Sequence, residues 1–228
     1  MKAFVAAMSA AAASVGISYA APVTVSLMNL YVDHNGVAHI DDVVTDHGTI
    51  DFVISGMVKK NGEWVLSDDM SSGSTGVWLD RGYGDNHQVD GRGRDEGILI
   101  QAQSADNSEL VPVDFTSFTF TYVSSDDDFS VYGSEEGYQT VSLIHDDLDI
   151  PGVSSPYISS PVTAPILVEN VATVIVAAIE KNDDWKLKSF SFEWVKDPVD
   201  PVPVPGAAVL MAAGLGALGI ARKKRHSA

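Results

Sequence analysis

Apolar and polar side chains alternate along most of the chain between residue 21 and about residue 197. Val23, Val25 and Leu27 alternate with small polar residues, and Phe118 and Phe120 alternate with threonines further along. A period of two residues is that of a β-strand with one buried face, whereas a helix repeats its apolar positions every 3.6 residues. No segment of helical length in this stretch shows the second period, so we expect strands and turns.

One hairpin can be placed from the sequence. Lys60-Asn61-Gly62-Glu63 predicts a type I′ turn, because Asn and Gly tolerate positive φ at both central positions. Its arms are expected at 49–60 and 63–67. Further short strands are expected at 76–79, 97–103, 110–113, 115–123, 129–132, 140–145 and 186–195. The β-branched, largely uncharged run Ile166–Ile179 is typical of one strand buried on both faces.

These strands predict an all-β fold: an antiparallel β-sandwich of jelly-roll type at residues 21–196, flanked by an N-terminal signal helix and a C-terminal transmembrane helix. The expected core contains Phe118, Phe120, Val174, Val176, Phe190 and Phe192. The runs Asp126–Tyr132 and Asn182–Leu187 share an order of two acids followed by an aromatic residue. We interpret both runs as polar turns that lead into hairpin strands.

The first twenty residues have the pattern of a secretory signal peptide. Lys2 is followed by an apolar run, and Ser18-Tyr19-Ala20 places small residues before a cleavage point between Ala20 and Ala21. The alternative, a core helix, would lack a polar face for water. Export through the Sec translocon is therefore expected.

The other end of the sequence has three consecutive parts. Residues 197–205 form a proline-rich spacer, which proline keeps extended. Gly206–Ala221 is uncharged, and Arg222, Lys223, Lys224 and Arg225 follow it. The uncharged run predicts a transmembrane helix at 206–221 with the basic cluster on the cytoplasmic side. An ordinary tail anchor is the alternative to a processed signal.

Val202-Pro203-Val204-Pro205-Gly206, with the apolar run and basic cluster after it, resembles the VPLPA variant of the PEP-CTERM sorting signals. Val204 stands where that motif has Leu, and Gly206 where it has Ala. The resemblance covers residues 202–228 and implies recognition by an exosortase, a membrane-embedded protease or transpeptidase of Gram-negative bacteria. The glycine- and aspartate-rich stretch Gly82–Gly97 resembles a loop of other secreted proteins of this kind, which implies a β-sandwich without assigned chemistry.

Charge and composition narrow the set of partners. The chain has a net charge of −17, and its span from Asp33 to Asp200 holds nine bases and all 31 acids, a net charge of −22. Such a body repels nucleic acid and anionic lipid, so neither is an expected partner. Cysteine is absent, which excludes disulfides, cysteine-ligated zinc, iron–sulfur clusters and thiol catalysis.

The loop at 80–96 is a candidate calcium site. Calcium takes six to eight oxygen ligands on a backbone that can bend, and this loop combines acids with four glycines. The candidate ligands are Asp85, Asp90, Asp95 and Glu96. The alternative is a solvated acidic loop in which Arg81, Arg92 and Arg94 neutralise the carboxylates.

Three classes of function follow from these patterns. The leading hypothesis is an exported, non-enzymatic protein that is transiently anchored in the inner membrane and then lies on the cell surface or in an extracellular polysaccharide matrix. The second is a calcium-dependent carbohydrate-binding module, for which Trp64, Trp78, Tyr83, Trp185 and Trp194 offer stacking rings unless they pack in the core. An enzyme ranks last, because the sequence nominates no nucleophile–base pair.

Overall fold

The computed structural model describes residues 21–80, 88–106, 109–153 and 158–194. The chain divides into two compact units, Met1–Trp194 and Val195–Ala228, and the fold below is that of the first. Both predicted terminal helices lie outside the described residues and stay predictions. Within the described ranges, no helix is long and apolar enough to span a membrane.

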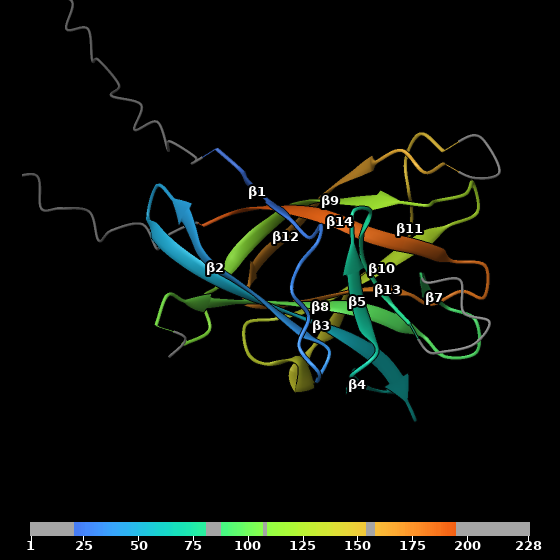
Figure 1. Cartoon of the computed structure of the whole chain (residues 1–228), viewed down its shortest axis with the longest axis horizontal. Coiled ribbons are helices and arrows are strands. Elements are labelled where there is room, and N and C mark those ends of the chain that lie inside the picture. The colour runs from blue at the N-terminus through green and yellow to red at the C-terminus, as the bar shows by residue number, and fades with distance from the viewer. Residues whose placement is uncertain (1–20, 81–87, 107–108, 154–157, 195–228) are drawn as a thin grey trace, which may run out of the picture. The chain divides into compact units, whose positions relative to one another are not determined.

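Two antiparallel sheets form a sandwich-like arrangement (Figure 1). The first sheet has the order β12 (Val162–Val171), β9 (Val113–Thr121), β14 (Asp184–Glu193), β6 (Gly76–Leu79) and β5 (Met70–Gly73), and both β1 (Val23–Ser26) and β7 (Val89–Asp90) also pair with β14. The second sheet has the order β11 (Ser142–Asp149), β10 (Asp128–Ser134), β13 (Thr173–Ala178), β8 (Glu96–Ser104), β3 (Gly48–Lys60) and β2 (Val37–Thr45), and β4 (Glu63–Ser67) also pairs with β3. A single 3-10 turn, η1 (Tyr138–Thr140), is the helical element of the described part of the chain.

The predicted hairpin is confirmed. Strands β3 and β4 pair up to Lys60 opposite Glu63, so the loop has two residues. Asn61 has φ of 55° and Gly62 has φ of 87°, the positive values that a type I′ turn needs at both positions.

The prediction of a single strand at Ile166–Ile179 is wrong. The chain leaves the first sheet at the end of β12, passes Ala172 and enters the second sheet as β13. The Ala172 carbonyl accepts the Ala102 N–H, and the Ala172 N–H donates to the Ser134 carbonyl, so the crossing residue is bonded on both sides. Hydrophobicity is continuous across the crossing and therefore gives no sign of it.

One more predicted strand needs correction, and strand β2 was not predicted. The expected strand at 110–113 is reduced to an isolated bridge between Leu110 and Gln103, and β9 begins at Val113. Strand β2 escaped the sequence analysis because a bulge breaks its alternation between Ile40 and Val43. At the bulge Asp42 has φ of 57°, and its N–H donates to the buried Asp51 carboxylate at 2.7 Å.

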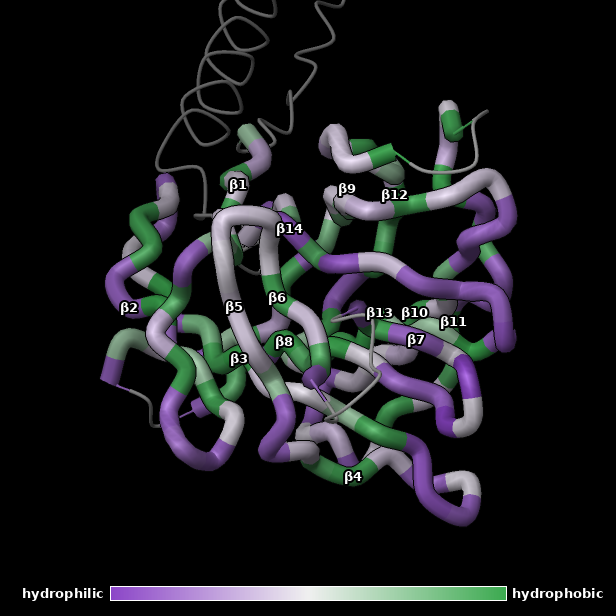
Figure 2. The backbone as a smooth tube through the Cα atoms, turned by 45° about the vertical axis from the view of Figure 1, so that its right-hand side comes forward, coloured by the Kyte–Doolittle hydropathy of each residue, from purple (hydrophilic) through white to green (hydrophobic). Residues whose placement is uncertain are grey.

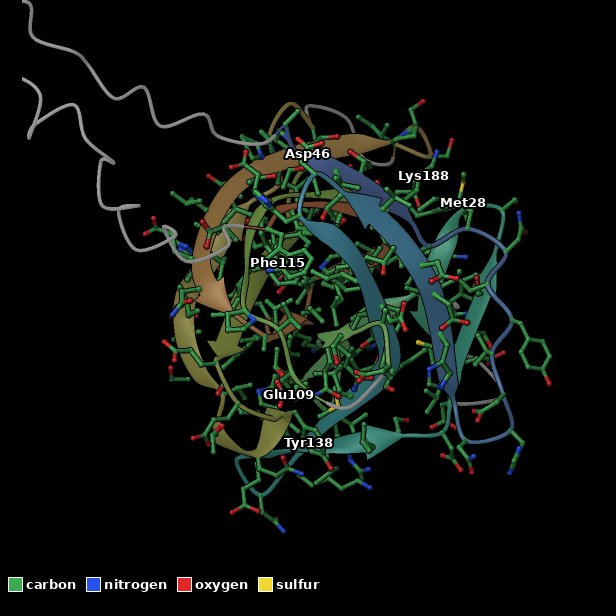
Figure 3. All side chains as sticks on the ribbon, turned by 90° about the vertical axis from the view of Figure 1, so that its left-hand side faces the viewer. Met28, Asp46, Glu109, Phe115, Tyr138 and Lys188 are labelled. Atoms are coloured by element: carbon green, nitrogen blue, oxygen red, sulfur yellow. The ribbon has the colours of Figure 1, made fainter. Side chains whose placement is uncertain are left out.

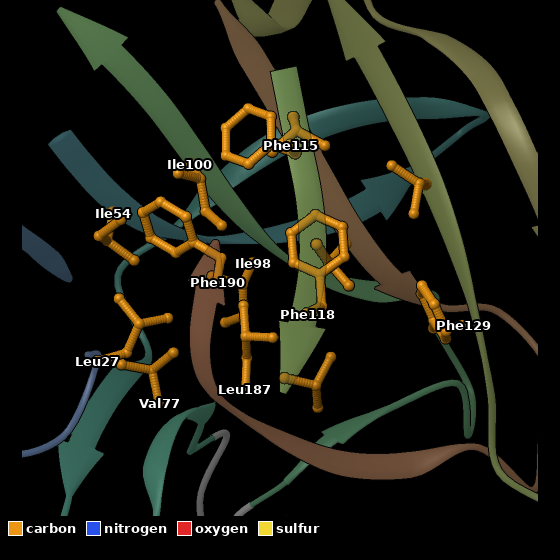
Figure 4. Packing of buried hydrophobic residues seen from close by; sticks show 14 of the residues in the cluster. Leu27, Ile54, Val77, Ile98, Ile100, Phe115, Phe118, Phe129, Leu187 and Phe190 are labelled. Carbon is orange, nitrogen blue, oxygen red and sulfur yellow. The ribbon is translucent and has the colours of Figure 1, made fainter. Parts of the chain in front are cut away.

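The main core lies between the two sheets, and every predicted core residue is fully buried there. Figure 4 shows Phe118 and Phe190 among the side chains of this core. Phe52 of β3 packs edge-on against two rings of β14, with centroid distances of 5.0 Å to Phe190 and 4.9 Å to Phe192. Phe120 of β9 contacts Phe129 of β10 at 4.8 Å. Figure 3 shows the labelled Phe115 inside the fold, with Asp46 and Lys188 on the outside.

A smaller apolar cluster covers the outer face of the second sheet. Its buried members are Met57, Trp64, Leu99, Ile175 and Ala177. This cluster explains why all six residues of β13 are buried: alternate side chains contact the main core and the outer cluster. Hydrophilic segments lie mainly at the turns, as the purple parts of the tube in Figure 2 show.

We expect Phe52→Ala to lower the free energy of unfolding by about 3–5 kcal/mol, because it removes ring contacts across the two sheets and leaves a cavity. Val44→Ala on the neighbouring strand β2 is the control: Val44 is 73% exposed, and its change should stay within about 0.5 kcal/mol. Urea unfolding measures both. Similar losses for the two variants would contradict this description of the core.

Candidate functional site

The two turns with an acid–acid–aromatic order meet at one end of the sandwich. One oxygen of Asp127 accepts the N–H of Asp184 at 3.0 Å, and one oxygen of Asp183 accepts the N–H of Asp128 at 3.2 Å. Strand β10 begins at Asp128 and β14 begins at Asp184, so each aspartate bonds to the first residue of a strand in the opposite sheet. We call Asp127 and Asp183 the reciprocal aspartate pair.

The second oxygen of each aspartate binds its own turn. Asp127 accepts the N–H of Ser124, and Asp183 accepts that of Glu180 at 2.8 Å and that of Ile179 at 3.2 Å. Both aspartates are buried, so these backbone donors replace the water that a carboxylate needs. The two turns therefore have the same local design. The prediction that both lead into hairpin strands is confirmed for β10, which pairs with β11, and is wrong for β14, which pairs with no described strand adjacent to it in the chain.

The aromatic residue after each acid pair turns into the core. The Trp185 indole N–H donates to the Asp128 carbonyl at 3.0 Å, which fixes the ring of the first sheet to the backbone of the second. Phe129 and Trp185 both pack on Phe120, at 4.8 Å and 5.1 Å between ring centroids. Polar and apolar contacts thus hold the same junction.

Carboxylates gather around this junction, which we call the acidic end. Its members are Asp126, Asp127, Asp128, Asp146, Asp147, Asp149, Asp183 and Asp184. Burial raises the pKa of Asp183 and of Asp184 to about 6 each. Burial is also the largest cause that raises the pKa of Asp128 to about 7, and the charges of Asp147, Asp183 and Asp149 raise it further. Asp149, opposite Asp128 in the β10–β11 register, also forms a hydrogen bond with it.

A cavity of about 230 Å³ opens at the acidic end. Its lining includes Ser130, Asp146, Asp147, Glu180 and Asp183. The Ser130 hydroxyl donates to the Asp146 carboxylate at 3.1 Å and accepts the N–H of Asp147 at 3.1 Å. As the pH falls from about 7 to about 6, the carboxylates of Asp128, Asp183 and Asp184 at this end take up protons.

The predicted calcium ligands are engaged in different contacts. Asp85 lies outside the described residues. Asp95 forms a salt bridge of 3.3 Å with Lys59, whereas the buried Glu96 accepts the N–H of Asp90 at 3.0 Å. Within the described ranges, no group of three or more His, Asp or Glu side chains could hold a metal ion. A calcium site in this loop stays a prediction.

The rings considered for sugar stacking separate into two groups. Trp185 is fully buried and Trp64 is 8% exposed, so both pack in apolar clusters. Trp78 and Trp194 are half-buried and reach solvent, and Tyr83 lies outside the described residues. A sugar-binding face at the described residues would therefore have to include Trp78 or Trp194.

Each sheet carries on its outer face a lysine over a tryptophan and a tyrosine. On the second sheet, Lys59 lies 5.5 Å from the Trp64 ring and 5.3 Å from the Tyr132 ring. On the first sheet, Lys186 lies 4.0 Å from the Trp78 ring. Sequence analysis missed both groups, because their members come from strands far apart in the chain.

The first and last described residues lie at the end of the molecule opposite the acidic end. Strand β1 pairs with the far end of β14, with Val23 opposite Phe192, whereas the reciprocal aspartate pair lies at its start. Ten strand residues separate the two ends, a distance of about 30 Å. Ala21, after the predicted cleavage point, is exposed, and the residues of the predicted sorting signal lie outside the described ranges.

We expect the free energy of unfolding of the body to decrease as the pH rises from 5 to 8. The raised pKa values of Asp128, Asp183 and Asp184 mean that the folded state binds more protons than the unfolded state, so their stabilising contribution is complete below about pH 4 and is lost through pH 6–7. Asp128→Asn cannot titrate and should be more stable at pH 8, with a smaller difference between the two pH values. Urea unfolding at both pH values measures this effect.

The slope of the free energy of unfolding against pH should differ between Asp128→Asn and the wild type by less than about 1.4 kcal/mol per pH unit, because Asp128 is partly exposed to screening solvent. The control is Asp46→Asn in the exposed turn between β2 and β3, which should leave the wild-type pH dependence unchanged. An undiminished pH dependence in Asp128→Asn would contradict the electrostatics of the acidic end.

No family model, no curated protein and no solved structure matches this chain.

Proposed function

We propose that the chain is an exported, non-enzymatic protein of the cell surface or extracellular matrix of a Gram-negative bacterium, sorted by an exosortase-type membrane protease or transpeptidase. The observation that carries the proposal is the order of three parts after the body. Val202–Gly206 supplies a recognition segment, Gly206–Ala221 an apolar span, and Arg222–Arg225 a cationic stop. The inner membrane is then a transient location.

The arrangement of the body suits attachment at one end. Ala21, after the predicted cleavage point, and Trp194, the last described residue, lie near each other, because β1 pairs with the final part of β14. A tether that follows Trp194 leaves the acidic end about 30 Å away along β14. The acidic end is thus far from the proposed point of attachment.

The proposed partner outside the cell is an extracellular polysaccharide. A net charge of −22 between Asp33 and Asp200 keeps the body soluble and allows divalent cations to bridge it to an anionic polymer. The finer description of the body as jelly-roll-like is part of this proposal. It is supported by the chain's alternation between the sheets from β8 to β10 and from β12 to β14.

Intact-mass spectrometry of the protein exported by the producing cell tests the sorting proposal. We expect the mature protein to lack residues 1–20 and the cluster Arg222–Arg225. A variant with alanine at Val202, Pro203, Val204, Pro205 and Gly206 should keep the cluster, because the protease no longer recognises the segment.

The matched control is a variant with alanine at Asp197 and Asp200, which changes the spacer outside the recognition segment and should be processed like the wild type. Exported wild-type protein that still carries Arg222–Arg225 would contradict the proposal.

A further inference from the structure

Lys186, on the outer face of the first sheet, is buried, and none of the described carboxylates forms a salt bridge with it. Lys186 lies between Trp185 and Leu187, whose side chains enter the main core, so its own side chain leaves the opposite face of β14. It is only 9% exposed. Its ammonium group lies 4.0 Å from the Trp78 ring centroid and 4.8 Å from that of Tyr122.

Lys59 on the other sheet shows what the Lys186 group lacks. Its ammonium also lies over a tryptophan and a tyrosine, but it pairs with Asp95 at 3.3 Å and donates to the Tyr132 hydroxyl at 3.3 Å. Burial acts to lower the pKa of Lys59, yet the Tyr132 and Asp95 contacts outweigh it and raise that pKa. Burial alone lowers the pKa of Lys186, as expected for a cation without an anion.

A second donor of the same group also lacks a partner. The indole N–H of Trp78 is buried and forms no hydrogen bond within the described residues. The indole N–H of Trp64 is unpaired as well, so this feature alone does not distinguish the two groups. The two groups differ in their lysines: Lys59 pairs with Asp95, whereas Lys186 and the Trp78 N–H both lack an acceptor among the described residues. Lysine and tryptophan side chains only donate hydrogen bonds, so these two donors cannot satisfy each other.

The chemistry of the group defines its ligand. Two donors without acceptors fit an oxygen anion, and two half-buried rings fit an apolar C–H face. Asp184, two residues before Lys186 on the same face of β14, and the negative body disfavour a doubly charged phosphate. A pyranose with a single carboxylate has both the face and the charge.

We propose that Lys186, Trp78 and Tyr122 bind the carboxylate-bearing pyranose of an acidic polysaccharide. The carboxylate accepts from the Lys186 ammonium and the Trp78 indole N–H, and the sugar ring contacts the aromatic side chains. The proposal rests on the proposed location outside the cell, because that is where such a polymer is met.

Isothermal titration of the full chain in a non-ionic detergent tests the site. The solution contains about 0.15 M salt, so that charges of the body beyond about 8 Å are screened. The probes are trisaccharides of glucuronate, galacturonate and mannuronate, their neutral methyl esters, and acetate. We expect at least one acidic trisaccharide to bind about tenfold or more tightly than its methyl ester and than acetate.

Two variants and a matched control identify the residues. Lys186→Met keeps an unbranched apolar side chain and should lose the preference for the acid, with a melting temperature no lower than that of the wild type. Trp78→Phe keeps a ring but lacks the N–H and should bind more weakly. Lys59→Met removes the paired lysine of the other sheet and should bind like the wild type.

Three results would overturn the proposal: no binding of any uronate, equal binding of an acid and its methyl ester, or an unchanged preference in Lys186→Met. Acetate binding as tight as that of the trisaccharides would overturn the assignment of a sugar. The intact mass of the same Lys186→Met variant shows whether the cluster Arg222–Arg225 has been removed. This measurement separates the proposed sugar site from the proposed sorting by an exosortase. Processed protein that binds no uronate contradicts only the sugar site, whereas unprocessed wild type contradicts the proposed function.

Discussion

Two buried aspartates each accept an amide hydrogen from the first residue of a strand in the opposite sheet. A carboxylate loses its hydration when it is buried, so it is stable there only while several donors face it. Asp127 and Asp183 obtain those donors from their own turn and from the other turn at once. Neither turn can therefore take its conformation alone, and their mutual dependence fixes where β10 and β14 start. The Phe129 and Trp185 rings enter the core from those two points.

Strand β14 connects the features that bear on function. Its first residue belongs to the acidic end, its third residue is the buried Lys186, and its last residues pair with β1 near the proposed points of cleavage and tethering. Because the carboxylates at this end are buried and close together, the folded state binds more protons near neutral pH than the unfolded state does. Lys186 lies on the outer face between the two ends, and no described carboxylate forms a salt bridge with it. The proposed contact with an acidic polymer rests on these features.

Much of the fold could be predicted from alternation and turn chemistry. The Asn61-Gly62 hairpin and the buried Phe118, Phe120, Phe190 and Phe192 are confirmed, because period two and positive φ are local properties. The crossing at Ala172 could not be predicted, since β12 and β13 are both apolar and the change of sheet is decided by partners distant in sequence. The same reason hid the Lys186 group, which three separate strand regions bring together. The two acid–acid–aromatic runs were visible in the sequence, but their reciprocal contact was not.

A double-mutant cycle on Asp127 and Asp183 tests most directly whether these two residues join the sheets as one unit. Stability is measured by urea unfolding at pH 7.5 for Asp127→Ala, Asp183→Ala and the double variant. The matching Asp→Asn cycle, in which each side chain loses its charge but keeps one acceptor oxygen, separates hydrogen bonding from repulsion. The account predicts that the double alanine variant loses less stability than the two single losses combined, by about 1 kcal/mol or more, because the first substitution already releases the partner turn. Losses that add to within about 0.3–0.5 kcal/mol would contradict it.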